Sequence, residues 1–183
     1  MKFKEAAERS VAFLKSEEFK ERVLEEDASM LRQLPVLQRI NASGFITVDS
    51  QAGKRIKGKN YKTGKPYEEI ERAYLAGFML EPVAIEFIKT MALKTDKNAA
   101  VLPACDAYMP SSLDIPLTVV KRAGETVVDT HFSPALPRST IETFKKNVNL
   151  NKSEKVVYVH CWDTVWGREG LFNDVLRVLK QIA

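Results

Sequence analysis

The predicted fold depends on residues 67–79, which read Tyr67-Glu-Glu-Ile-Glu-Arg-Ala-Tyr-Leu-Ala-Gly-Phe-Met79. Its glutamates fall in what would be the first turns of a helix, where acidic side chains interact favourably with the helix dipole. We therefore predict a helix over residues 67–79. Because Pro82 cannot lie in a helix interior, a second helix is expected to begin there and to continue to about Leu93.

Apolar strands are predicted both before and after these helices in the sequence. Residues 99–105 and 155–161 form nearly continuous apolar runs, which are typical of buried strands. A shorter strand over residues 45–48 follows a turn at Gly44. The remaining elements are a β-hairpin made by residues 117–120 and 126–131, and helices over residues 34–40, 140–148 and 170–180.

This alternation of strands and helices predicts an α/β fold in the form of a three-layer sandwich. The sheet should be mixed and mostly parallel, with the antiparallel hairpin at one edge. The strands that contain Phe45, Ala100 and Val156 are expected to be parallel in its centre. Residues 1–33 are expected to form an amphipathic helical segment, and residues 34–183 a single α/β domain.

Composition limits the class of protein. A chain of 183 residues with 45% apolar residues is ordinary for one compact domain. The two cysteines, Cys105 and Cys161, lack the spacing of a metal site, so both are expected to be small buried residues. No apolar run approaches the ~18 residues that cross a bilayer. We therefore expect an intracellular location in the cytoplasm, the nucleus or a virion, without membrane contact.

Positive charge is concentrated in a basic loop, residues 51–67. The loop contains six cations and no acid, whereas the formal net charge of the whole chain is +4. Residues 53–60 come close to a phosphate-binding loop, but Asn60 replaces the hydroxyl residue that would hold magnesium, and Gly and Pro follow where a helix should begin. The loop is therefore expected either to be a mobile solvated loop or to fold over an anionic ligand or partner.

Three segments resemble an uncharacterised family of small α/β proteins that we associate with actinobacteria and large DNA viruses. They are Ile-Asn-Ala-Ser-Gly-Phe-Ile-Thr-Val-Asp-Ser-Gln-Ala-Gly from Ile40, Ile-Glu-Arg-Ala-Tyr-Leu-Ala-Gly-Phe from Ile70, and Cys-Trp-Asp-Thr-Val-Trp-Gly-Arg-Glu-Gly-Leu-Phe from Cys161. The resemblance extends over about residues 34–179. Ala52 departs from the Pro that is usual there, and the loop after it is longer and more basic. The resemblance implies a fold and no established activity, cofactor or catalytic residue.

Three aspartates follow predicted strands, and they are the candidate catalytic residues. Asp49, Asp106 and Asp163 would meet if the strands were parallel neighbours, because ligands bind at the carboxyl edge of such sheets. Together they could hold a divalent metal or act as acid and base, although an aspartate at a strand end also commonly caps the next turn. The metal and the cofactor stay unassigned. The candidate ligand-binding residues are Ser50, Gln51, Lys57, Lys59, Arg72, Trp166 and Arg168.

A more specific prediction concerns residues 162–170, which we call the closing turn. Asp163 and Arg168 are five residues apart around a glycine, which lets the two side chains meet. We predict that Asp163 accepts hydrogen bonds from the backbone or from Arg168 in this turn. His160 is expected to be a satisfied core or surface histidine, although a pair with Asp163 is conceivable.

Two classes of function follow from these residues. The first is a small-ligand-binding or enzymatic domain that acts on an anionic molecule, either phosphorylated or nucleotide-like, with the basic loop as a lid. The second is a noncatalytic structural or interaction protein, such as a virion component, that docks on a protein or on nucleic acid through its N-terminal helix and basic loop. A contact of clustered cations with nucleic acid would be nonspecific and salt-dependent.

Overall fold

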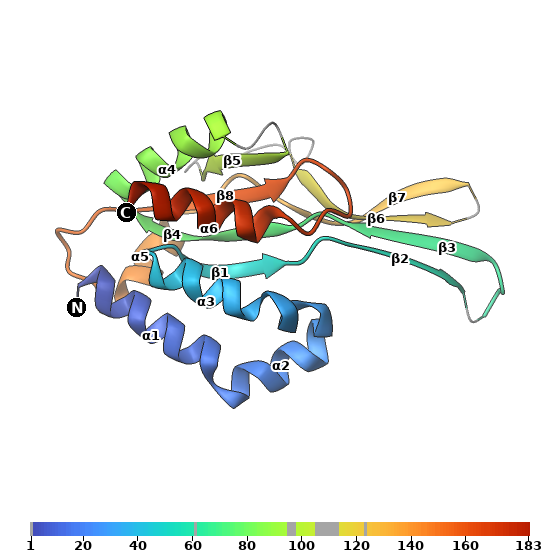
Figure 1. The fold of residues 1–183 in the computed structure, drawn as a ribbon, viewed down its shortest axis with the longest axis horizontal. Helices are drawn as coiled ribbons and strands as arrows, with labels where there is room; N and C mark the ends of the chain where they lie inside the picture. Colours follow the sequence, from blue (N-terminus) through green and yellow to red (C-terminus); the bar gives the residue numbers. More distant parts are fainter. Residues whose placement is uncertain (1, 61, 95–97, 105–113, 123) are drawn as a thin grey trace.

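The computed structural model describes residues 2–60, 62–94, 98–104, 114–122 and 124–183. A helix-covered body contains one four-stranded sheet, and a second four-stranded sheet extends from the body as an arm (Figure 1). We refer to these as sheet A and sheet B. Within the described residues, no helix is long and apolar enough to cross a membrane.

Sheet A is antiparallel throughout. Its strand order is β1-β4-β8-β5, which places β1 and β5 at its edges. The strands are β1 (Ile46–Gln51), β4 (Tyr74–Leu80), β5 (Ala99–Pro103) and β8 (Val156–Asp163). The central strand β4 is buried along almost its whole length. Its run of apolar residues, interrupted by Gly77, suits a strand that is covered on both faces.

Helices cover one face of sheet A. Helix α6 (Leu171–Ile182) lies between α3 (Leu34–Ala42) and α4 (Glu81–Lys94) in this layer. The core between the layer and the sheet contains Leu75 and Met79 of β4 and Val159 of β8. The strong amphipathicity of α6 follows from this packing, since Leu171, Phe172, Val175, Leu176, Val178 and Leu179 are all buried.

A second apolar cluster covers the opposite face of sheet A. It contains Tyr74, Ala76 and Phe78 of β4, which alternate with the residues of the first face. Helix α5 (Arg138–Asn147) packs Phe144 against Phe78, with 3.8 Å between the ring centroids. The base of sheet B also contributes to this cluster through Leu117 and Phe132.

The N-terminal helices pack beside the edge strand β1. Helix α1 (Phe3–Lys15) contacts α3 and β1, and α2 (Glu17–Asp27) and the short helix η1 (Ala28–Gln33) follow it. Ser16 separates α1 from α2 and accepts a hydrogen bond from the backbone N–H of Phe19 as the cap of α2. Both apolar clusters include residues of these helices.

Sheet B is also antiparallel, with the order β2-β3-β6-β7. It consists of two hairpins whose strands extend away from the body (Figure 1). Its strands are β2 (Lys54–Lys59), β3 (Pro66–Glu71), β6 (Ile115–Arg122) and β7 (Glu125–Phe132). Since β1 leads into β2 and β3 leads into β4, the arm is continuous with sheet A along the chain.

The prediction of a mostly parallel sheet was wrong. Both sheets are antiparallel, and the predicted helix over residues 67–79 is strand β3 followed by strand β4. Without that helix, β1 is joined to β4 through strands β2 and β3, and β1 and β4 pair as antiparallel neighbours. The predicted basic loop likewise contains strand β2 and the start of β3.

Candidate functional site

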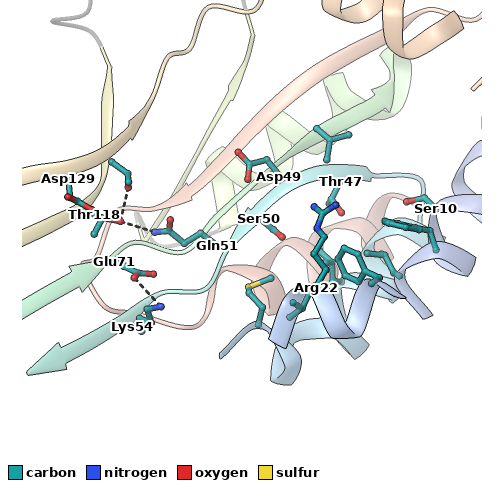
Figure 2. A pocket seen from close by; sticks show the side chains of 18 of the residues that line it. Ser10, Arg22, Thr47, Asp49, Ser50, Gln51, Lys54, Glu71, Thr118 and Asp129 are labelled. Carbon is teal, nitrogen blue, oxygen red and sulfur yellow. Dashed lines mark hydrogen bonds and ion pairs between the residues drawn. The ribbon is translucent and has the colours of Figure 1, made fainter. Parts of the chain in front are cut away.

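An open cavity of about 610 Å³ lies along the edge strand β1 and is the candidate functional site. Helices α1, α2, η1 and α3 form one side of it, and strands of both sheets form the other. Figure 2 shows side chains of both sides, with Ser10 and Arg22 on the helices and the other labelled polar residues on the strands. The helical side is largely apolar, and its lining includes Phe13, Leu14, Phe19, Val23, Met30 and Leu37.

The position of β1 explains why the cavity has a polar wall. As an edge strand, β1 pairs with β4 on one side and leaves its other side open. A register shift between Thr47 and Asp49 places a bulge at Val48, whose side chain is 54% exposed. Bulges of this kind re-aim side chains and end strand pairing at sheet edges. Thr47, Asp49, Ser50 and Gln51 consequently line the cavity.

A buried amide fixes β1 against the helices. The Asn41 Nδ2 atom donates to Thr47 Oγ1 at 2.8 Å, and Asn41 Oδ1 accepts from the backbone N–H of Thr47 at 3.0 Å. Ser10 of α1 donates to the same Asn41 oxygen at 2.8 Å. Because Asn41 is fully buried, these bonds determine how α1, α3 and β1 meet at the cavity.

Acidic side chains outnumber basic ones in the cavity lining. The cations are Arg22 and Lys54, and Lys54 forms an ion pair with Glu71 at 3.1 Å. Nearby hydroxyls are connected, since Thr130 donates to Thr118 at 2.7 Å. The excess of carboxylates favours a neutral or cationic ligand over an anion. The four acidic residues of the lining are Asp49, Glu69, Glu71 and Asp129.

Asp49 faces the cavity from the middle of β1. Its side chain is exposed, yet desolvation by the surrounding protein raises the pKa of its carboxyl above the ordinary value. A hydrogen bond with the backbone of Ser50 opposes part of this shift. Burial raises the pKa of Tyr158 to about 12, and the negative charge of Asp49 adds to the shift. Asp49 is therefore electrostatically coupled to the interior of sheet A.

A buried histidine lies one strand further into the sheet. The register places Asp49 opposite Ala76, and Ala76 opposite His160. His160 Nδ1 and the hydroxyl of Tyr74 are hydrogen-bonded at 2.9 Å. The ring of Phe132 stacks on His160 with 4.8 Å between centroids. Burial lowers the pKa of His160 to about 4, so the imidazole is neutral near pH 7, as expected of a core histidine.

Several predicted ligand-binding residues meet where the arm joins the body. Gln51 Nε2 donates to the backbone oxygen of Arg72 at 3.2 Å and to Thr118 Oγ1 at 3.4 Å. The guanidinium of Arg72 lies over the ring of Trp166, 4.0 Å from its centroid. It also donates to the backbone oxygen of Pro116 at 3.3 Å. Through these contacts Arg72, which lies between β3 and β4, connects β1 and β6 to the closing turn.

The expected bond between Asp163 and Arg168 is confirmed. Arg168 Nη1 donates to Asp163 Oδ2 at 2.7 Å, and the backbone N–H of Val165 donates to Asp163 Oδ1 at 3.0 Å. Arg168 also bonds Asp174 of α6 at 2.6 Å. Desolvation raises the pKa of the fully buried Asp163, although both hydrogen bonds favour its charged form. Arg168 thus connects Asp163 at the end of β8 to α6.

The structure does not bring Asp49 and Asp163 together. Strand β4 separates β1 from β8, and the two aspartates lie on opposite faces of sheet A. Asp106 lies outside the described residues. No group of three or more potential metal ligands occurs in the part of the chain that the structure describes. Whether Asp49 or Asp163 takes part in catalysis stays a prediction.

The other predicted site residues divide between the cavity and the arm. Ser50 lines the cavity with Asp49 and Gln51, whereas Lys57 and Lys59 lie on β2 outside its lining. Sequence reasoning missed Arg22, Thr118, Asp129 and Thr130. The hairpin that carries the last three was predicted, but nothing in its sequence indicates that it faces the N-terminal helices.

A family model described as a domain of unknown function (DUF6919) matches residues 11–182. The match covers nearly the whole chain, including the end of α1, both sheets and helix α6. No curated protein matches the chain.

Proposed function

Because the chain belongs to the DUF6919 family, whose function is unknown, we propose from its geometry that it is a small-ligand-binding domain. The observation that supports this proposal is the cavity of about 610 Å³ along β1. Its volume falls within the usual range for small-molecule sites, roughly 300–1,000 Å³. The combination of an apolar helical side with a few convergent polar groups is also typical of such sites.

The lining defines the class of ligand. Aromatic side chains of Phe13 and Phe19 lie on the helical side, and Asp49 and Gln51 offer oxygen acceptors on the strand side. A matching ligand has an apolar part and a part that donates hydrogen bonds or carries positive charge. The anionic ligand predicted from the basic loop finds no support in this lining, since Lys57 and Lys59 lie elsewhere.

A series of three fragments with one common ring tests the proposal. Benzylamine, benzyl alcohol and benzoate differ mainly in charge, and each would be titrated into the ¹⁵N-labelled protein. We expect benzylamine to shift the backbone amide signals of Val48, Asp49, Ser50 and Gln51 with a Kd on the order of 1 mM, a typical affinity for so small a ligand. Benzyl alcohol should bind more weakly, and benzoate should leave these signals unchanged.

A pair of variants makes this test specific. Asp49→Asn should weaken benzylamine binding by about fivefold, because it removes one partly exposed charge, and should leave benzyl alcohol binding unchanged. Glu142→Gln removes the same charge from the exposed surface of α5 and should change neither affinity. Preferential binding of benzoate would contradict the ligand class. Shifts confined to residues outside the cavity, or no shift with any fragment, would contradict the site itself.

A further inference from the structure

The arm has one strongly cationic face. In a β-strand, alternate side chains point to the same side, so Arg55, Lys57 and Lys59 of β2 share a face of sheet B. The register places Glu68 of β3 opposite Lys57, and Lys121 of β6 opposite Glu68. We call the surface formed by Arg55, Lys57, Lys59 and Lys121 the cationic face.

A single carboxylate lies among these cations. Glu68 is within 3.4 Å of Arg55 and within 3.7 Å of both Lys57 and Lys121. Its side chain is 19% exposed, whereas the side chains of Arg55, Lys57 and Lys121 are 50%, 73% and 50% exposed. One acid cannot neutralise four cations, and it lies beneath them. The charge that this face presents to solvent is therefore positive.

The other face of the arm has a different composition. It carries Lys54, Glu69 and Glu71, which line the cavity. Further along the arm, Arg122 lies opposite Glu125. Acids and bases are thus nearly balanced on the cavity side, and the excess positive charge of the arm lies on the cationic face. A solvated hairpin needs no such separation of charge between its two faces.

We propose that the cationic face is a docking surface for the phosphate backbone of nucleic acid. Cations at alternate positions of β2 are spaced by roughly 7 Å. This spacing is comparable to the separation of successive phosphates along one strand of nucleic acid. The arm extends from the body, so a long polyanion can lie along it without meeting the helices (Figure 1).

The residue types on the cationic face favour nucleic acid over other polyanions. Among its described residues, strands β2, β3, β6 and β7 present no aromatic side chain on this face, and Val128 of β7 is its large exposed apolar side chain. Protein interfaces usually depend on buried aromatic anchors, and membrane-surface binding depends on inserted apolar groups. Contacts of lysine and arginine with phosphates need neither, and they do not read base sequence.

The test is the salt dependence of duplex binding, measured by fluorescence anisotropy with the full-length protein. Two unrelated DNA duplexes of about 20 base pairs should bind with similar affinity, with a slope of log K against log salt of about −3 between ~50 and ~200 mM. The double variant Lys57→Gln/Lys59→Gln should flatten this slope by nearly 2, since each phosphate contact contributes about −0.9.

Two further variants distinguish binding at the cationic face from a general effect of the protein's net charge. Lys89→Gln/Lys180→Gln removes the same charge from exposed positions of α4 and α6 and should leave the slope unchanged. Glu68→Gln removes the covered acid and should tighten binding severalfold. Thermal melting of each variant shows that it is folded, and a variant that melts far below the wild type is replaced by the corresponding Lys→Met or Glu→Met variant, which also removes the charge.

Four results would overturn the proposal. The first is the absence of duplex binding at ~50 mM salt, where contacts with phosphates are strong. The second is an equal loss of affinity in the control double variant. The third is binding of poly-L-glutamate at least as tight as binding of DNA, which would indicate an acidic protein partner. The fourth is preferential binding to phosphatidylserine vesicles, which would indicate a membrane surface.

Discussion

At the scale of single residues, His160 shows how burial controls protonation in this protein. The imidazole is 3% exposed and is enclosed by aromatic rings, and its Nε2 atom has no hydrogen-bond partner among the described residues. A charged imidazole would lose hydration here without gaining an acidic partner. Burial accordingly lowers the pKa of His160 from 6.5 to about 4.

This shift predicts a pH-dependent stability. Between about pH 6.5 and pH 4 the unfolded chain binds a proton that the folded chain does not, so the free energy of unfolding falls as the pH decreases. From pH 7 to pH 5 the loss should be about 2 kcal/mol. Urea denaturation of His160→Gln should show a flatter pH dependence over this range. A slope that is the same in His160→Gln and in the wild type would contradict this explanation.

At the scale of elements, residues 67–79 explain why the predicted architecture was wrong. The glutamates at 68, 69 and 71 suit the first turns of a helix, but they also fit the antiparallel pair of β2 and β3, in which Glu71 pairs with Lys54 and Glu68 with Arg55. Cross-strand pairs of this kind depend on residues that are more than ten positions away in sequence. Local patterns do not contain that information, and tertiary pairing overrides helix propensity.

Elements with strong local signals were predicted correctly. Helices α3, α4 and α6, strands β5 and β8, and the β6–β7 hairpin all lie close to their predicted positions. Gly44 has the positive φ that the turn before β1 requires, at 89°. The candidate site was only partly predictable. Ser50, Gln51 and Asp49 could be found at a strand end, whereas the helices and the hairpin that complete the cavity could not.

Gly77 offers a test of how closely β1 and β4 approach. A Cβ atom at this position would lie 2.1 Å from the backbone oxygen of Ile46, and backbone cannot move aside as a side chain can. Gly77→Ala should therefore lower the free energy of unfolding by about 2–3 kcal/mol, measured by urea denaturation. In Gly58→Ala the new atom would meet the partly exposed ring of Tyr67, and the change should be within ~0.5 kcal/mol. Equal effects of the two variants would contradict this explanation.

For the molecule as a whole, we expect the outer part of the β2–β3 hairpin to be dispensable for folding of the body. Neither apolar cluster contains a residue between Ala52 and Ala73. Arg55 and Ile70 lie directly opposite each other, so a two-residue Asn-Gly turn can replace residues 56–69 and close the shortened hairpin. The shortened chain should fold, with a Tm within about 5 °C of the full-length protein.

Circular dichroism and thermal melting would check this prediction. The β2 and β3 residues near the body, including the ion pair of Lys54 with Glu71, stay in place, so the cavity keeps most of its lining. An aggregated product, or one without a cooperative transition, would show that the arm is needed for folding. Because the deletion removes Lys57 and Lys59, the shortened chain should also lose most of its affinity for DNA duplexes.

The order of strands in sheet A has a consequence for the nascent chain. The central strand β4 has β1 and β8 as its neighbours, and β8 begins at Val156, late in the sequence. Helix α6, which covers the sheet, follows β8. During synthesis one edge of β4 therefore keeps its backbone N–H and C=O groups unpaired until β8 has left the ribosome. Such distant pairing slows folding and extends the period in which aggregation or chaperone binding competes with it.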